Sequence, residues 1–217
     1  MKETLRRLSL VMIATALVFT GCKKDQENNN NGDGGNGATT NVINGHEYVD
    51  LGLSSGTKWA TCNVGATTPE EYGDYYAWGE ITTKSEYTRE NSRTYGFKMN
   101  DISGNSSYDV ACVNWGGAWR MPTEQEMDEL EDDCAWFWTT QNGIDGMKVY
   151  GPNGNSIFLP AGGFCDGSSR GVGEVCRYWS STPYSSTNTT DAYCFSSKEY
   201  RYRGCTVRPV VDIYIND

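Results

Sequence analysis

The stretch Trp119-Arg-Met-Pro-Thr-Glu-Gln-Glu-Met-Asp-Glu-Leu-Glu-Asp-Asp-Cys134 decides where the chain becomes helical. Thr123 follows a proline and precedes Glu126 by three residues, which is the pattern of a helical capping box. The acidic residues at most other positions are interpreted as a solvated face rather than as paired acid–base carboxylates. Three residues recur at helical spacing and are expected to form the buried face: Met127, Leu130 and Cys134.

The sequence around this helix alternates in the manner of short strands. Two pairs of runs are expected to form hairpins, residues 47–51 with 57–62 and residues 148–151 with 156–159. Further strands are expected at residues 175–180, 192–196 and 206–215. With 25 glycines in the loops, these elements predict a single α+β domain of short antiparallel strands, few helices and many loops, over residues 42–217.

The composition excludes several classes of function. The 217 residues carry 18 Lys and Arg against 28 Asp and Glu, a net charge of −10, which argues against a nucleic-acid partner. The single histidine, His46, is interpreted as a strand-edge residue and excludes a site with several histidine ligands. No spacing resembles a zinc site, and no catalytic residue, metal or cofactor is expected.

The first 41 residues predict export and membrane anchoring. A basic start precedes an apolar run at residues 8–20, which is shorter than the roughly 20 residues that a membrane span needs. The run ends at Cys22 in a sequence that resembles a bacterial lipobox, although a cysteine that merely follows a signal peptide is the alternative. Residues 1–21 are therefore predicted to be a lipoprotein signal peptide, and residues 22–41 a lipidated, flexible tether.

The residues just after this anchor are partly acidic and resemble the surface-export signals of Bacteroidetes lipoproteins. That resemblance implies a lipid-anchored protein of the outer membrane, exposed at the cell surface.

Six blocks of the sequence carry a resemblance to a known family: residues 48–66, 73–80, 114–123, 157–160, 178–181 and 207–209. They include Trp-Arg-Met-Pro-Thr at 119–123 and Tyr-Trp-Ser-Ser at 178–181, and together they resemble the Fibrobacter succinogenes major paralogous domain family. The resemblance spans about residues 46–210 and implies a C-type-lectin-like fold of the formylglycine-generating-enzyme kind. It implies little about activity.

Two sites found in proteins of that fold lack their motifs in this chain. Formylglycine-generating enzymes use a close pair of late cysteines, whereas Cys194 and Cys205 are eleven apart and lack that local motif. Sugar-binding lectins hold calcium through Glu-Pro-Asn or Gln-Pro-Asp with Trp-Asn-Asp, and this chain has Gly-Pro-Asn at 151–153. Neither the enzyme activity nor a calcium site is therefore carried over.

The chain has eight cysteines, and lipidation of Cys22 would leave an odd number that cannot all pair within one chain. Two disulfides are candidates. Cys194 and Cys205 could face each other across a hairpin centred near residues 199–200, and Cys62 could pair with the inward-facing Cys134.

The C-terminal segment is the candidate for a binding face. Residues 179–208 contain 4 Tyr, 6 Ser and 5 Thr, a composition typical of antibody paratopes, although an ordinary polar loop is the alternative. The residues expected to contact a ligand are Tyr184, Asn188, Asp191, Tyr193, Tyr200, Arg201 and Tyr202. Most tryptophans are interpreted as core, and Trp136 and Trp138 are the expected exceptions.

The same segment resembles the variable region of surface proteins that are diversified by retroelements. We therefore predict a lipid-anchored surface protein that binds a surface protein or glycan without catalysis. Two alternatives are an enzyme related to the formylglycine-generating group and a structural envelope or fimbria-associated protein. A concave face built by residues 184–203 would favour binding, and a buried cysteine pair open to a cleft would favour the enzyme.

Overall fold

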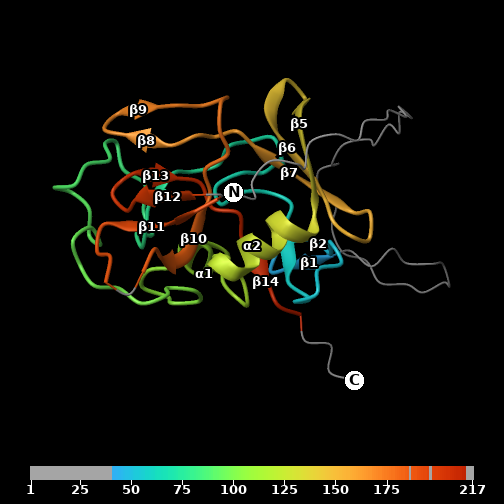
Figure 1. The fold of residues 1–217 in the computed structure, drawn as a ribbon, viewed down its shortest axis with the longest axis horizontal. Coiled ribbons are helices and arrows are strands. Elements are labelled where there is room, and N and C mark those ends of the chain that lie inside the picture. The colour runs from blue at the N-terminus through green and yellow to red at the C-terminus, as the bar shows by residue number, and fades with distance from the viewer. Residues whose placement is uncertain (1–40, 186, 196, 214–217) are drawn as a thin grey trace, which may run out of the picture. The chain divides into compact units, whose positions relative to one another are not determined.

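The computed structural model describes residues 41–185, 187–195 and 197–213. The predicted signal peptide, the predicted lipidation site Cys22 and nearly all of the predicted tether lie outside the described residues. Within them the chain consists mostly of antiparallel strands in four small sheets, with two helices (Figure 1). No helix in this part of the chain has the length and apolar character that crossing a membrane would require.

One sheet joins the two ends of the described domain. Its strands follow the order β1 (Val42–Ile43), β2 (His46–Val49), β3 (Lys58–Ala60) and β14 (Val210–Val211). The pairing of β2 with β3 confirms the first predicted hairpin. The turn between them uses Gly56 at a positive φ of 78°, a conformation that glycine adopts without strain.

A three-stranded meander follows the second helix. It contains β5 (Ala135–Gln141), β6 (Ile144–Tyr150) and β7 (Ser156–Pro160). The pairing of β6 with β7 confirms the second predicted hairpin. Strand β5 was not expected, although Asn142 and Gly143 at the β5–β6 turn both have the positive φ values that an Asn-Gly turn supplies.

The remaining strands form two sheets from the late part of the chain. One contains β10 (Trp179–Pro183), β11 (Asp191–Cys194) and β12 (Ser197–Tyr200). The other contains β4 (Tyr76–Ala77), β13 (Gly204–Cys205), β8 (Cys165–Asp166) and β9 (Ser169–Arg170).

Of the three further strands predicted for this region, one corresponds to an observed strand, one begins later than predicted and one is shorter than predicted. The strand expected at 192–196 corresponds to β11. The one expected at 175–180 begins later, at Trp179, because Tyr178 makes only an isolated bridge to Thr206. Of residues 206–213 only Val210–Val211 is a strand, since the proline at 209 has no N–H for a ladder.

Both helices begin at side-chain caps. The Asp109 carboxylate accepts hydrogen bonds from two N–H groups of α1 (Val110–Trp115). Helix α2 (Glu124–Asp133) has the predicted capping box between Thr123 and Glu126. Met127 and Leu130 are buried as expected, and Cys134 packs half-buried at the end of the helix.

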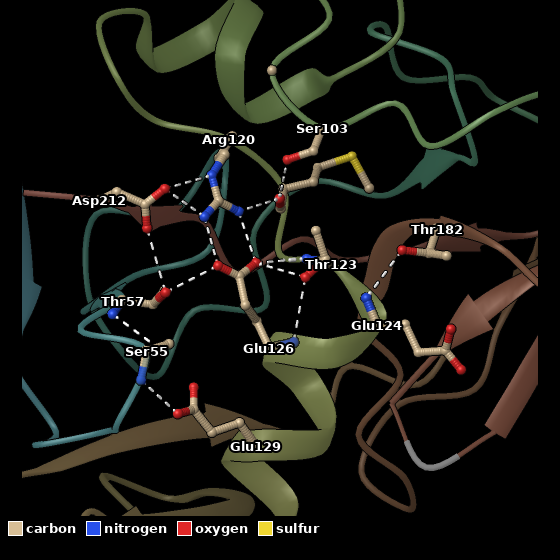
Figure 2. Close-up of polar contacts among 12 residues, drawn as sticks. Ser55, Thr57, Ser103, Arg120, Thr123, Glu124, Glu126, Glu129, Thr182 and Asp212 are labelled. Atoms are coloured by element: carbon tan, nitrogen blue, oxygen red, sulfur yellow. Dashed lines mark hydrogen bonds and ion pairs between the residues drawn. The ribbon is translucent and has the colours of Figure 1, made fainter.

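Hydrogen bonds and ion pairs connect the start of α2 to residues near the end of the described chain. Figure 2 shows Arg120 between Asp212 and Glu126, and its Nη atoms lie 2.7 Å from Asp212 Oδ2 and 2.7 Å from Glu126 Oε2. Burial is the largest single influence on Glu126 and would raise its pKa, but the hydrogen bonds and charge of Arg120, together with the hydrogen bonds from Thr123 and Thr57, outweigh it and the pKa is lowered. Because Thr57 also donates to Glu126, this network fixes α2 against two distant segments.

Two large apolar clusters form the core. One surrounds Trp78, Trp119 and Trp179, and the other packs Trp59 against α2 and the β5–β7 sheet. The interpretation of these four tryptophans as core is confirmed, because each is almost completely buried. The packing leaves one side of α2 beside the aromatic residues Trp136 and Trp138 of β5, Tyr193 of β11 and Phe195.

Candidate functional site

Two adjoining hollows run along α2. The first has a volume of about 420 Å³ and lies between α2 and the β11–β12 hairpin, and the second, about 490 Å³, lies between the end of α2, β5 and β6. Glu131 and Phe195 line both hollows. We call the two together the α2 groove.

The first hollow presents two tyrosines and a lysine opposite the helix. The rings of Tyr184 and Tyr193 lie 5.2 Å apart, and Lys198 Nζ lies 4.4 Å from the centroid of the Tyr184 ring. The Tyr193 hydroxyl donates to the Glu124 carboxylate, and this hydrogen bond raises the pKa of Tyr193 to about 12. The phenol stays protonated, and its single O–H is donated to Glu124.

The second hollow is more apolar. Trp136 packs its ring against Phe195, with centroids 4.8 Å apart, and its Nε1 donates to the Leu130 carbonyl oxygen at 3.0 Å. Trp138 projects from the same face of β5 and is 48% exposed. The prediction that these two tryptophans lie outside the deep core is confirmed, since Trp136 is half-buried. An exposed indole beside apolar side chains provides a flat surface on which a ligand can stack.

Of the seven residues predicted to contact a ligand, Tyr184 and Tyr193 line the α2 groove. Tyr200 and Asp191 line a smaller neighbouring hollow of about 230 Å³, together with Lys198 and Glu199. Tyr184 and Tyr200 are each 38% exposed. The structure thus brings three of the four predicted tyrosines to one surface.

The prediction for Arg201 needs correction, because its side chain is 0% exposed. Its Nε donates to the Asp191 carbonyl oxygen, Nη1 to that of Phe97 and Nη2 to that of Asn188, at 2.9–3.0 Å. Its guanidinium carbon lies 4.4 Å from the Trp78 ring. The Arg201 guanidinium is thus held by three backbone carbonyl oxygens and the Trp78 ring. It links the loops that carry these groups and is not available to a ligand.

Two further predicted contacts also serve the fold. Tyr202 is buried and stacks on Tyr200 with ring centroids 5.5 Å apart. The Asn188 side chain accepts hydrogen bonds from the backbone N–H groups of Thr190 and Asp191, both at 2.8 Å. An asparagine that caps its own turn has its carbonyl oxygen occupied. The prediction for the buried Tyr202 is therefore corrected, whereas that for Asn188, which is half-buried, stays a prediction.

The predicted disulfides are not formed, because Cys134, Cys194 and Cys205 are thiols. Cys194 pairs with Ser197 on β12, so the hairpin closes before the expected position near 199–200. The thiols of Cys194 and Cys205 are nonetheless hydrogen-bonded to each other. Burial, followed by this contact, raises the pKa of Cys205 well above its ordinary value.

Sequence reasoning missed several residues that line the groove. Lys198 and Phe195 lie in the segment 179–208 that was predicted to bind, but they were not predicted to contact a ligand. Lys198 is two residues before Tyr200 and therefore lies on the same face of β12. Glu124, Asp128 and Glu131 were interpreted as solvated. Their spacing places them along one side of α2, but no sequence signal indicates that this side borders a hollow.

The described residues show no arrangement of three or more His, Cys, Asp or Glu side chains that could hold a metal ion. His46 stacks on Trp115 with ring centroids 3.7 Å apart, and burial lowers its pKa. His46 is half-buried in β2, so it lies in a strand as expected, but β2 lies between β1 and β3 and is not at the edge of the sheet.

Comparison of the chain with models of protein families, with curated proteins and with solved structures gave no match. The fold and the site define a small, mostly antiparallel β domain that carries an open groove lined by aromatic and acidic side chains.

Proposed function

We propose that this protein is a lipid-anchored cell-surface protein that binds a surface protein or glycan, in adhesion or recognition, through a C-type-lectin-like domain. The observation that carries the proposal is the α2 groove. It presents the exposed side chains of Trp138 and Tyr184 in a concave surface. Large aromatic side chains in concave surfaces contribute much of the energy of binding interfaces.

The dimensions and lining of the groove support binding. Each hollow falls within the range of about 300–1,000 Å³ that is typical of ligand sites. Aromatic rings alternate with groups that can hydrogen-bond, including the Tyr193 hydroxyl and the Lys198 ammonium. This combination gives both contact area and orientation to a bound group.

The anchor would place the groove outside the cell. Lipidation at Cys22 gives a durable hold when more than one acyl chain is attached. The roughly 20 residues of a flexible tether would have a root-mean-square span of about 25 Å between the anchor and the domain. A retroelement-diversified segment would then supply variation at Tyr184, Lys198 and Tyr200, and a reverse transcriptase beside a near-copy of codons 179–208 would support that part of the proposal.

The test is an array of glycans and surface proteins probed with the domain, followed by titration of variants. Tyr184→Ala and Trp138→Ala are each expected to weaken binding by about 1–3 kcal/mol, roughly 5- to 150-fold. Phe97→Ala and Tyr150→Ala are the matched controls, because both residues are exposed aromatics that do not line the groove. Equal losses in all four variants would contradict the assignment.

A second candidate, an enzyme related to the formylglycine-generating group, is favoured by one observation. Cys194 lines the first hollow, and its thiol is hydrogen-bonded to that of Cys205. Against this, thiol chemistry requires a thiolate, and the raised pKa of Cys205 keeps it protonated. A mass change in cysteine-containing peptides that depends on Cys194 would establish the enzyme, and its absence would favour binding.

A further inference from the structure

Negatively charged side chains outnumber positively charged ones along the α2 groove. Glu124, Asp128 and Glu131 follow α2 at spacings of four and three residues, and Glu174 adds a carboxylate to the second hollow. The only cations among the lining residues are Lys198 and Arg177. On a chain of net charge −10, this surface attracts positively charged groups and repels acidic glycans.

The first hollow already holds a cation of the protein's own. Lys198 Nζ lies 4.4 Å from the centroid of the Tyr184 ring and 3.4 Å from Asp191 Oδ2. The face of an aromatic ring attracts an ammonium or guanidinium group through its quadrupole. The Lys198 side chain is about half exposed, so its ammonium group can move away when another cation arrives.

The two hollows differ in chemistry. The first combines carboxylates with tyrosines, whereas the second presents Trp138, Met147 and Val175 beside Trp136. A polypeptide can satisfy both, because neighbouring side chains along one segment can be basic and apolar. A neutral glycan would use the aromatic rings but would gain no charge attraction from the carboxylates.

We propose that the groove binds a polypeptide segment of a partner protein, with a lysine or arginine side chain in the first hollow and an adjacent apolar side chain on Trp138. This inference rests on the proposed function and specifies its ligand. The cation is held by Asp128, Glu131 and the Tyr184 ring. The apolar side chain covers the exposed indole of Trp138.

The probe is a fluorescein-labelled nonapeptide in which lysine and leucine alternate, titrated against the full chain by anisotropy. Matched peptides carry glutamine or glutamate in place of lysine. The lysine peptide is expected to bind at least tenfold more tightly than either, and to weaken between 50 and 300 mM salt because screening shortens the range of charge attraction.

Two helix variants remove equal charge from different sides of α2. Asp128→Asn with Glu131→Gln is expected to weaken the lysine peptide about tenfold. Asp132→Asn with Asp133→Asn, which alters exposed carboxylates that do not line the groove, should change it less than twofold. Lys198→Ala should strengthen binding, because the competing internal cation is removed.

Equal binding of the lysine and glutamine peptides, or equal losses in the two helix variants, would overturn the inference. If a neutral glycan binds instead, is lost in Tyr184→Ala and Trp138→Ala, and is indifferent to Asp128 and Glu131, the inference fails while the proposed function stands. If neither glycans nor peptides depend on Tyr184 and Trp138, both fail.

Discussion

Replacing Arg201 by methionine is expected to destabilise the domain without touching the groove. The guanidinium donates to three backbone carbonyl oxygens at 2.9–3.0 Å and lies over Trp78. Methionine fills a similar apolar volume but donates no hydrogen bond. Arg201→Met would therefore leave these carbonyl groups buried without their partner, which is more costly than the bond itself is favourable.

The size of the effect follows from these contacts. Hydrogen bonds from charged donors contribute about 1.5–3 kcal/mol each, so three of them are a large fraction of a domain's stability. Burial lowers the pKa of Arg201 to about 10, and relief of that unfavourable burial in the variant offsets part of the loss. The net decrease in unfolding free energy is expected to be about 3 kcal/mol, or roughly 6–12 °C in melting temperature.

Urea unfolding followed by tryptophan fluorescence measures this change, because Trp78 contacts the guanidinium. Tyr184→Ala is the control, and its exposed side chain should alter stability by about 0.5 kcal/mol or less. A loss below about 1 kcal/mol in Arg201→Met, combined with lost ligand binding, would show that Arg201 contacts ligand and that its structural assignment is wrong.

Four further outcomes are expected. Glu126→Gln should cost about 1–2 kcal/mol at pH 7, because Arg120 loses one of its two charged partners and keeps Asp212. The folded-state pKa of Glu126 is lowered from 4.5, so the stability difference from wild type should shrink as the pH falls below 4.5 and through the folded-state pKa. Urea titrations at pH 7 and pH 3 will show this change. Cys205 should resist iodoacetamide in the native protein and react after unfolding, and rapid native labelling would contradict its burial. Tyr202→Ala should lower stability by about 2–4 kcal/mol in thermal unfolding, because a buried ring is removed. Cys22→Ala should abolish palmitate labelling and membrane association, and retained label would defeat the lipoprotein proposal.

The local parts of the fold were predictable from the sequence. The capping box of Thr123 and Glu126 and both predicted hairpins were found where expected, because neighbouring residues along the chain determine them. Strand β5 was missed, since it follows α2 with no glycine or proline between the two elements. Its pairing with β6 is as local as the two predicted hairpins, and Asn142-Gly143 at the turn between them is the sequence signal for it.

The site was predictable only in part. Tyrosine-rich composition located the segment that contributes Tyr184 and Tyr193 to the groove. The composition could not distinguish the exposed Tyr200 from the buried Tyr202, because tyrosine and arginine alternate over residues 200–203, where β12 ends. Nor could it show that Arg201 meets carbonyl groups from residues about 10 to more than 100 positions away.

The most direct test of ligand binding in the α2 groove uses the indole N–H signals of the tryptophans. A two-dimensional ¹⁵N–¹H spectrum is recorded while the tightest ligand from the array is added. The signals of Trp136 and Trp138 are expected to shift with ligand concentration, whereas those of the buried Trp59 and Trp179 stay in place. Binding that leaves the Trp136 and Trp138 signals unmoved would contradict the groove as the binding site.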